Sequence, residues 1–295
     1  MTTPDTVPAT AAPAPATGPA VSSGALERAP SPPVAVATGL TKSYGAVLAV
    51  DSLDLEIRRG EVFGLIGANG AGKTTTIKML ITLVPPTSGS ARIAGHDVSR
   101  EAATVRRAIG YVPQLVSADG SLTGIENLRL SARLYHLPGR EIEARIRELL
   151  TFMGLGEAMH RLVRTYSGGM VRRLEIAQAM LHEPEVLFLD EPTVGLDPTA
   201  RTAVWEHLDR LRAEHGTTII VTTHYLTEAE VLCDRVAIMH HGRIIALDTP
   251  VALAASVGPG ATLDDVFRLL VGADIETGGG LRDVARARRT ARRLG

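Results

Sequence analysis

Residues 67–74, GANGAGKT, have the residue types and the spacing of a loop that binds phosphate. The loop follows the apolar run VFGLI and precedes a segment expected to be helical. Glycine allows a backbone path on which successive N–H groups point at an anion, and the start of the helix adds partial positive charge. Lys73 would place a mobile positive charge on the β- and γ-phosphates of a nucleotide, and Thr74 would offer a hydroxyl to Mg²⁺. The residues expected to line the phosphates are Gly67, Ala68, Asn69, Gly70, Ala71, Gly72, Lys73, Thr74 and Thr75.

A pair of acids follows a second apolar run. In EVLFLDEP, residues 185–192, four apolar residues lead into Asp190 and Glu191. Ligands of open α/β sheets bind beyond the carboxyl ends of the strands, so Asp190 is expected to hold Mg²⁺ and Glu191 to activate water as a general base. Paired acids also end strands as solvated turn residues, and an incidental lysine can follow a glycine-rich turn. The presence of both motifs in one chain favours a nucleotide site.

Three single residues could complete this site. Gln114 ends the run IGYVPQ and could bind Mg²⁺ and sense the γ-phosphate. His224 ends the run TTIIVTTH and could contact the γ-phosphate or orient water. Tyr44 could stack on an adenine ring. Each residue taken alone is more often structural, so their assignment depends on the two motifs above.

The elements that must position these residues alternate along the chain. Short β-branched runs within residues 34–66 indicate several strands, expected as an antiparallel part near the N-terminus. Apolar spacings of three and four predict a helical insertion at about 115–165. From 168 onward, helices and apolar strands alternate, with residues 235–247 expected as one strand. This alternation predicts a parallel α/β sheet covered on both faces.

Composition divides the chain into three parts. Residues 1–33 are rich in Ala, Pro and Thr with few large apolar side chains, so we expect a disordered tail. Residues 34–255 are expected to form one nucleotide-binding domain, and 256–295 a small C-terminal extension. The last fifteen residues carry six arginines and one aspartate. That segment is expected to be a solvated helix or, alternatively, to contact anionic lipid or a partner.

The overall composition excludes several classes of protein. A net charge of −1 over 295 residues argues against nucleic acid as a partner. The single cysteine, Cys233, excludes an intrachain disulfide and a cysteine-based zinc site. No apolar run reaches the ~18–20 residues that span a bilayer, and no signal peptide is evident at the N-terminus. We therefore expect a soluble chain whose role at a membrane would require a partner.

The segment YSGGM, residues 166–170, adds the motif that is most specific. It lies about twenty residues before the paired acids, and with the phosphate loop it resembles the ATP-binding subunit of an ABC transporter over roughly residues 34–250. The resemblance implies a P-loop NTPase core of the ABC ATPase type. It also implies that Ser167, Gly168 and Gly169 cap an ATP held by a facing second copy, with Asp197 of GLDP crossing the same interface. A head-to-tail dimer with two sandwiched ATP molecules would explain two anion-binding helix starts in one chain.

Two further motifs point to a branch of this family. The commonest form of the signature begins with Leu and ends with Gln, whereas this chain has Tyr166 and Met170. The segment GGMVRR and the later TLDDVFRLLVG, residues 262–272, are similar to the daunorubicin-resistance branch of ABC exporters. This resemblance implies an ATPase at the cytoplasmic face of the cell membrane that energises a separate permease. The exported compound would be a drug, an antibiotic or another hydrophobic molecule.

Two alternatives remain at this point. A soluble ABC-type ATPase acting on ribosomes or DNA would usually carry two cassettes, a long coiled coil or a zinc insert, and the sequence contains none of these. A nucleotide-binding regulator without turnover would not need Glu191. The resemblance implies that Lys73, Thr74, Gln114, Asp190, Glu191 and His224 act on the ATP of their own chain.

Overall fold

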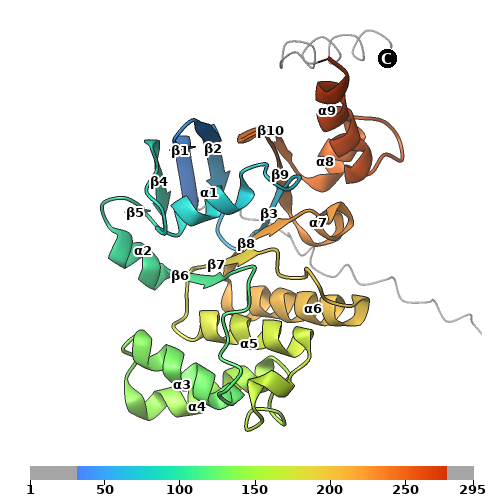
Figure 1. The fold of residues 1–295 in the computed structure, drawn as a ribbon. Helices are drawn as coiled ribbons and strands as arrows, with labels where there is room; N and C mark the ends of the chain where they lie inside the picture. Colours follow the sequence, from blue (N-terminus) through green and yellow to red (C-terminus); the bar gives the residue numbers. More distant parts are fainter. Residues whose placement is uncertain (1–31, 278–295) are drawn as a thin grey trace, which may run out of the picture. The chain divides into compact units, whose positions relative to one another are not determined.

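The computed structural model describes residues 32–277, so the N-terminal tail to residue 31 and the arginine-rich tail lie outside the described residues. Within residues 32–277, the strands form a four-stranded sheet in the order β2-β1-β4-β5 and a six-stranded sheet in the order β10-β9-β3-β8-β7-β6 (Figure 1). The strands are β1 (Ala35–Tyr44), β2 (Val47–Ile57), β3 (Val62–Ile66), β4 (Ser88–Ile93), β5 (His96–Asp97), β6 (Ile109–Val112), β7 (Val186–Asp190), β8 (Thr218–Thr223), β9 (Arg235–His240) and β10 (Arg243–Asp248). The α-helices are α1 (Lys73–Leu80), α2 (Ala102–Ala108), α3 (Gly124–Leu134), α4 (Gly139–Phe152), α5 (Gly168–Met180), α6 (Pro198–His215), α7 (Leu226–Leu232), α8 (Pro250–Ala255) and α9 (Leu263–Thr277).

The six-stranded sheet brings the carboxyl ends of three buried strands together. Strand β8 pairs in parallel with both β3 and β7, and β6 and β9 extend the parallel part on either side. Every residue of β3, β7 and β8 is buried, as expected for strands covered on both faces. The loops that follow these three strands therefore emerge at one edge of the sheet, where ligands of such sheets bind.

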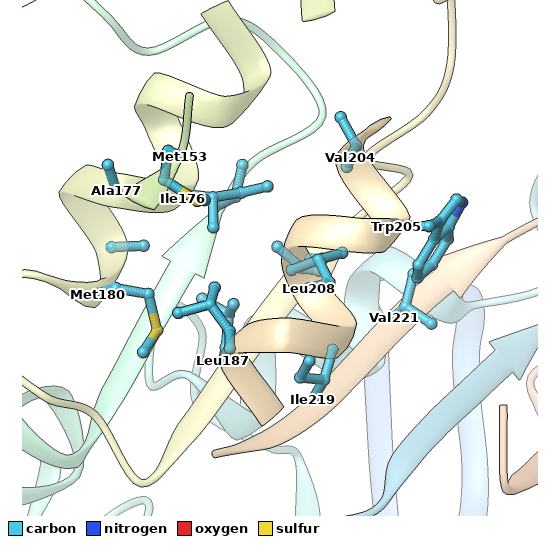
Figure 2. Close-up of a cluster of buried hydrophobic side chains, with 14 of the residues drawn as sticks. Met153, Ile176, Ala177, Met180, Leu187, Val204, Trp205, Leu208, Ile219 and Val221 are labelled. Atoms are coloured by element: carbon cyan, nitrogen blue, oxygen red, sulfur yellow. The ribbon is translucent and has the colours of Figure 1, made fainter. Parts of the chain in front are cut away.

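Side chains alternate between two cores on opposite faces of this sheet. Phe63 and Leu65 of β3 pack with α1 and the four-stranded antiparallel sheet. The other face packs against α5 and α6, which run along it (Figure 1). Figure 2 shows part of this second core, with side chains from α5 and α6 gathered over β7 and β8: Ile176, Ala177, Met180, Val204, Trp205, Leu208, Leu187, Ile219 and Val221.

The prediction of one strand over residues 235–247 is wrong. The segment forms β9 and β10, which pair antiparallel around a turn at His241 and Gly242. Both turn residues have positive φ, 44° and 78°, as in the tight turns that match the twist of a hairpin. The Gly242 N–H donates to the carbonyl of Ala71, so the turn also supports the loop that follows β3.

The segment from 115 to 165 contains two α-helices, α3 and α4, that pack on each other and on α5 (Figure 1). A capping box begins α3, because Thr123 and Glu126 each bond the other's backbone N–H. An ion pair between Arg129 and Glu143 joins α3 to α4. The sequence patterns did not predict α2. None of the helices within residues 32–277 combines the length and the apolar character that a membrane span requires.

Candidate active site

Two glycines of the loop after β3 are required by their surroundings. A Cβ at Gly67 would lie 2.4 Å from the carbonyl oxygen of Met239. Gly72 has φ of 107°, and a Cβ there would lie 2.5 Å from the carbonyl oxygen of Ala49. Ala68, Asn69 and Gly70 are exposed at the outer part of the loop, whereas Ala71 is buried and Thr75 is half-buried. The loop therefore passes close to two other segments before α1 begins.

The ammonium group of Lys73 is held at the mouth of this loop. Lys73 is 5% exposed, and its Nζ donates to the carbonyl oxygens of Gly67 at 2.8 Å and Ala68 at 3.1 Å. The nearest carboxylate oxygen, Oε1 of Glu191, lies 3.6 Å away. Burial lowers the pKa of Lys73, and the charge of Glu191 opposes this shift. A positive charge thus faces the loop next to the acid pair.

The carboxylate of Asp190 is fixed by two hydroxyl groups. Thr222 Oγ1 donates to Asp190 Oδ1 at 2.6 Å, and Thr74 Oγ1 donates to the same oxygen at 3.2 Å. Hydroxyl and carboxylate oxygens are the ligands that Mg²⁺ prefers, and this ion usually takes one or two protein carboxylates with substrate phosphates and water. No group of three or more His, Cys, Asp or Glu within the described chain could hold a metal by itself. The donor set at Asp190 and Thr74 therefore fits Mg²⁺ bound together with a nucleotide.

Glu191 has an unusual backbone and well-defined contacts. Its φ is 50°, in the left-handed region that costs a residue with a Cβ of order 1–3 kcal/mol. Its N–H is shared between the hydroxyl of Thr222 at 3.0 Å and the carbonyl of the same residue at 3.1 Å. Its Oε2 lies 3.1 Å from Nδ1 of His224, which is 35% exposed. The strained turn thus aims the carboxylate between Lys73 and His224.

Sequence reasoning missed Thr222, which belongs to this cluster, and Tyr111, whose hydroxyl feels the charge of Asp190. Thr222 contacts both acids, and the run TTIIVTTH holds no specific signal for these contacts, because threonine is common in strands. Tyr111 lies on β6, beside β7. Burial, with a smaller effect of Asp190, raises the pKa of the Tyr111 hydroxyl to about 12, so the phenol stays neutral beside the acids.

Gln114 and Tyr44 are exposed and make other contacts than those of the cluster around Glu191. Gln114 is exposed two residues after β6, and its carbonyl accepts a hydrogen bond from Arg172 Nη2 at 3.2 Å. Tyr44 ends β1 and is 47% exposed, with Lys42 Nζ 5.1 Å from the centre of its ring. The described contacts therefore join Lys73, Thr74, Asp190, Glu191 and His224 into one cluster, and they do not link Gln114 or Tyr44 directly to it.

The residues of the YSGGM segment form a second helix start, on α5. Ser167 is the N-cap, and its hydroxyl accepts from the N–H of Met170 at 3.3 Å. Ser167 and Gly168 are exposed, whereas a Cβ at Gly169 would lie 2.8 Å from the Cβ of Ala200. Asp197 is exposed at the N-cap of the neighbouring helix α6. Polar groups at the starts of two packed helices are thus open to solvent.

Tyr166, one of the two departures in this segment, is anchored by its hydroxyl. The side chain is buried, and its hydroxyl donates to the carbonyl of Ala158 at 2.7 Å. A Cβ at Gly124, the first residue of α3, would lie 2.6 Å from this hydroxyl. The larger residue at position 166 is therefore accommodated by the absence of a side chain at position 124.

The profile of the ABC transporter family matches residues 50–194. A curated relative is the daunorubicin/doxorubicin resistance ATP-binding protein DrrA of Streptomyces peucetius, 49% identical over 221 residues, which are 75% of this chain and 67% of the relative.

Two solved structures share the fold. An ATP-binding subunit of an ABC transporter has a TM-score of 0.72 and 35% identity, with 81% of this chain and 99% of that chain covered. A dimeric ATP-binding cassette in a post-hydrolysis state, bound to ADP and Pi, has a TM-score of 0.66 and 27% identity, with 73% of this chain and 98% of that chain covered.

Proposed function

This chain belongs to the ABC transporter family as an ATP-binding subunit, and we propose that it hydrolyses ATP to drive a separate membrane permease that exports a drug, an antibiotic or another hydrophobic compound. The chain is an ATPase of the ABC type with the corresponding α/β fold. The proposal on the exported compound is supported by the similarity to a daunorubicin/doxorubicin resistance protein. The single observation that supports turnover is the contact cluster around Glu191.

The proposed roles follow from these contacts. Lys73 binds the β- and γ-phosphates, because its ammonium group stands at a loop whose backbone can approach an anion. Glu191 accepts a proton from the attacking water, and His224 holds the carboxylate in place through the 3.1 Å contact. Tyr44 stacks on the adenine ring.

Mg²⁺ is the proposed metal. Asp190 and Thr74 would hold it, with Gln114 as a further ligand from the loop after β6. The bound ion would neutralise charge that develops on the phosphates. Thr222 supports this role because its buried hydroxyl fixes the Asp190 carboxylate.

The second anion-binding helix start supports a head-to-tail dimer of two copies. Ser167, Gly168 and Gly169 would cap the ATP of the facing chain, and Asp197 would cross the interface. All of these except Gly169 are exposed, so they are available to a second copy. ATP would close the dimer, and hydrolysis with phosphate release would reopen it.

The proposed location is the cytoplasmic face of the cell membrane, where the chain is bound through its permease. The helical segment at 115–165 would carry the docking surface. In this proposal, residues 34–255 form the nucleotide-binding domain and residues 256–295 form the C-terminal extension. Nucleic acid is not a proposed partner, because the net charge is −1.

The test of hydrolysis is Mg²⁺-dependent ATP turnover by the full chain. Glu191→Gln should keep ATP binding and lose turnover by about 10²-fold or more, the scale of a general base. It should also accumulate as a dimer with ATP in light scattering. The matched control is Glu185→Gln, which changes an exposed acid just before the same strand. Turnover by Glu191→Gln at the wild-type rate would contradict the assignment.

The test of export uses daunorubicin fluorescence in cells that produce the chain. Deleting the gene should raise the retained drug, and the wild-type gene should restore efflux. Glu191→Gln should not restore efflux, although it reaches the membrane fraction. Equal retention in all strains, for daunorubicin and for a panel of hydrophobic antibiotics, would argue against drug export while leaving the ATPase assignment intact.

A further inference from the structure

A buried ion pair on α5 lies outside the residues assigned so far. Arg172 is 6% exposed and Glu175 is 3% exposed, and Arg172 Nη1 lies 3.0 Å from Glu175 Oε2. The two side chains are three residues apart and share one face of the helix. Charged residues are rarely buried unless their groups are paired and hydrogen-bonded, so the remaining contacts of this pair indicate what it holds.

Both members of the pair bind the loop 113–117, which follows β6. Arg172 donates to the carbonyl oxygens of Pro113 at 2.8 Å and Gln114 at 3.2 Å. Glu175 Oε1 accepts from the N–H of Ser117 at 2.5 Å and from its hydroxyl at 2.9 Å. The pair therefore holds both ends of the loop by hydrogen bonds.

The loop has little apolar packing of its own. Between these hydrogen-bonded ends, Leu115 is 81% exposed and Val116 is 67% exposed. Buried apolar contact is what usually fixes a loop, so the path of this loop depends on the four hydrogen bonds from α5. A displacement of α5 must therefore displace the loop.

Ser167 is the N-cap of the same helix, and in the proposed dimer it contacts the ATP of the facing chain. Arg172 follows Ser167 by five residues, about 7.5 Å along the helix axis. We propose that Arg172 and Glu175 are positioning residues that make the Gln114 loop move with α5, and so couple the two ATP sites of the dimer. The inference rests on the proposed function, because Gln114 serves the ATP of its own chain and Ser167 serves the ATP of the facing chain.

The main test is the double variant Arg172→Met, Glu175→Leu in the full chain. It removes both charges at similar volume, so no buried charge is left unpaired and the fold should survive. Thermal melting checks this. In ATP turnover, kcat should fall about tenfold or more while KM for ATP changes less than about threefold, because the contacts of Lys73 are retained. Amide exchange at Ser117 should become faster.

Two further variants keep the test decisive. Gln178→Met is the matched control, because this residue of the same helix donates to the carbonyl of Asn127 on α3 at 3.4 Å and not to the loop. Its kcat should stay near the wild-type value. Arg172→Lys keeps the charge beside Glu175 but loses the forked donation to two carbonyls, so it should fold and show an intermediate kcat.

The outcomes separate this inference from the proposed function. Wild-type turnover together with an unchanged kcat in the folded double variant would overturn the inference alone. The same conclusion follows if Gln178→Met loses as much kcat as the double variant. Should the double variant fail to fold, an unchanged kcat in Arg172→Lys would overturn it. A wild-type chain without any ATP turnover would refute the proposed function and the inference together.

Discussion

Replacing Thr222 by valine should damage both the stability and the turnover of this protein. Thr222 is fully buried, and its hydroxyl donates to Asp190 Oδ1 at 2.6 Å while it accepts from the N–H of Glu191 at 3.0 Å. Valine has nearly the same shape, so the change removes the hydroxyl without leaving a cavity. It therefore separates hydrogen bonding from packing.

The size of the stability loss follows from the partners. A hydrogen bond to a charged group contributes about 1.5–3 kcal/mol. The N–H of Glu191 is not left alone, because the carbonyl of residue 222 accepts it at 3.1 Å. We therefore expect a loss of about 2 kcal/mol, which lowers the melting temperature by about 4–8 °C for a domain of this size.

The effect on catalysis should be a lower kcat with a nearly constant KM for ATP. Asp190 and Glu191 would lose the group that fixes their relative position, and we expect kcat to fall by about tenfold or more. The assay is Mg²⁺-dependent phosphate release well below the melting temperature. Thr222→Ser keeps the hydroxyl and is the control. Wild-type melting and turnover in Thr222→Val would refute the reasoning.

Further outcomes are expected for three other residues. Lys73→Ala should weaken ATP binding by more than about tenfold in a calorimetric titration, because the phosphates lose their counter-charge; unchanged affinity would exclude the assigned role. Tyr166→Phe should cost about 1 kcal/mol in denaturant unfolding and leave ATP turnover intact, since the carbonyl of Ala158 keeps the N–H of Arg161 as a donor; a loss of turnover would show a direct role of the hydroxyl. Burial raises the pKa of the Cys233 thiol to about 12 from its ordinary value of 9.0, so the native protein should resist iodoacetamide at pH 8. The pKa of Cys233 is higher in the folded state than in the unfolded state. The contribution of the neutral thiol to the free energy of unfolding is therefore present below about pH 9 and is lost as pH rises toward 12. Urea unfolding measured across that pH range would detect the loss.

The parts of the site that could be predicted from sequence are those encoded by contiguous residues. The phosphate loop with Lys73 carries its glycines, its lysine and its flanking strand and helix in one stretch of chain. The acids Asp190 and Glu191 directly follow an apolar run. In both cases the local pattern fixes the end of a buried strand, and the parallel sheet then brings these ends together.

The contacts that escaped prediction join segments far apart in sequence. Thr222 meets Asp190 across neighbouring strands, 32 residues away, and a threonine in a strand is too common to indicate this. In the sequence, Arg172 and Glu175 have the pattern of ordinary polar residues on a helix. They are buried because the loop after β6 packs against them, and the sequence does not show this contact. The hairpin of β9 and β10 was missed because the apolar pattern continues on both sides of Gly242, which marks the turn.

Because Tyr166 and Gly124 approach closely, the residues tolerated at one position depend on the residue present at the other. Alanine at the first residue of α3 would favour the helix by up to about 1 kcal/mol over glycine, yet its Cβ would lie 2.6 Å from the tyrosine hydroxyl. Gly124→Ala should thus be harmful in this chain but neutral or beneficial once position 166 has lost its hydroxyl. In the described geometry, tyrosine fits at position 166 only where position 124 is glycine. Once both residues are present, a substitution at position 124 alone produces this clash, so Gly124 can be replaced only after Tyr166 has changed.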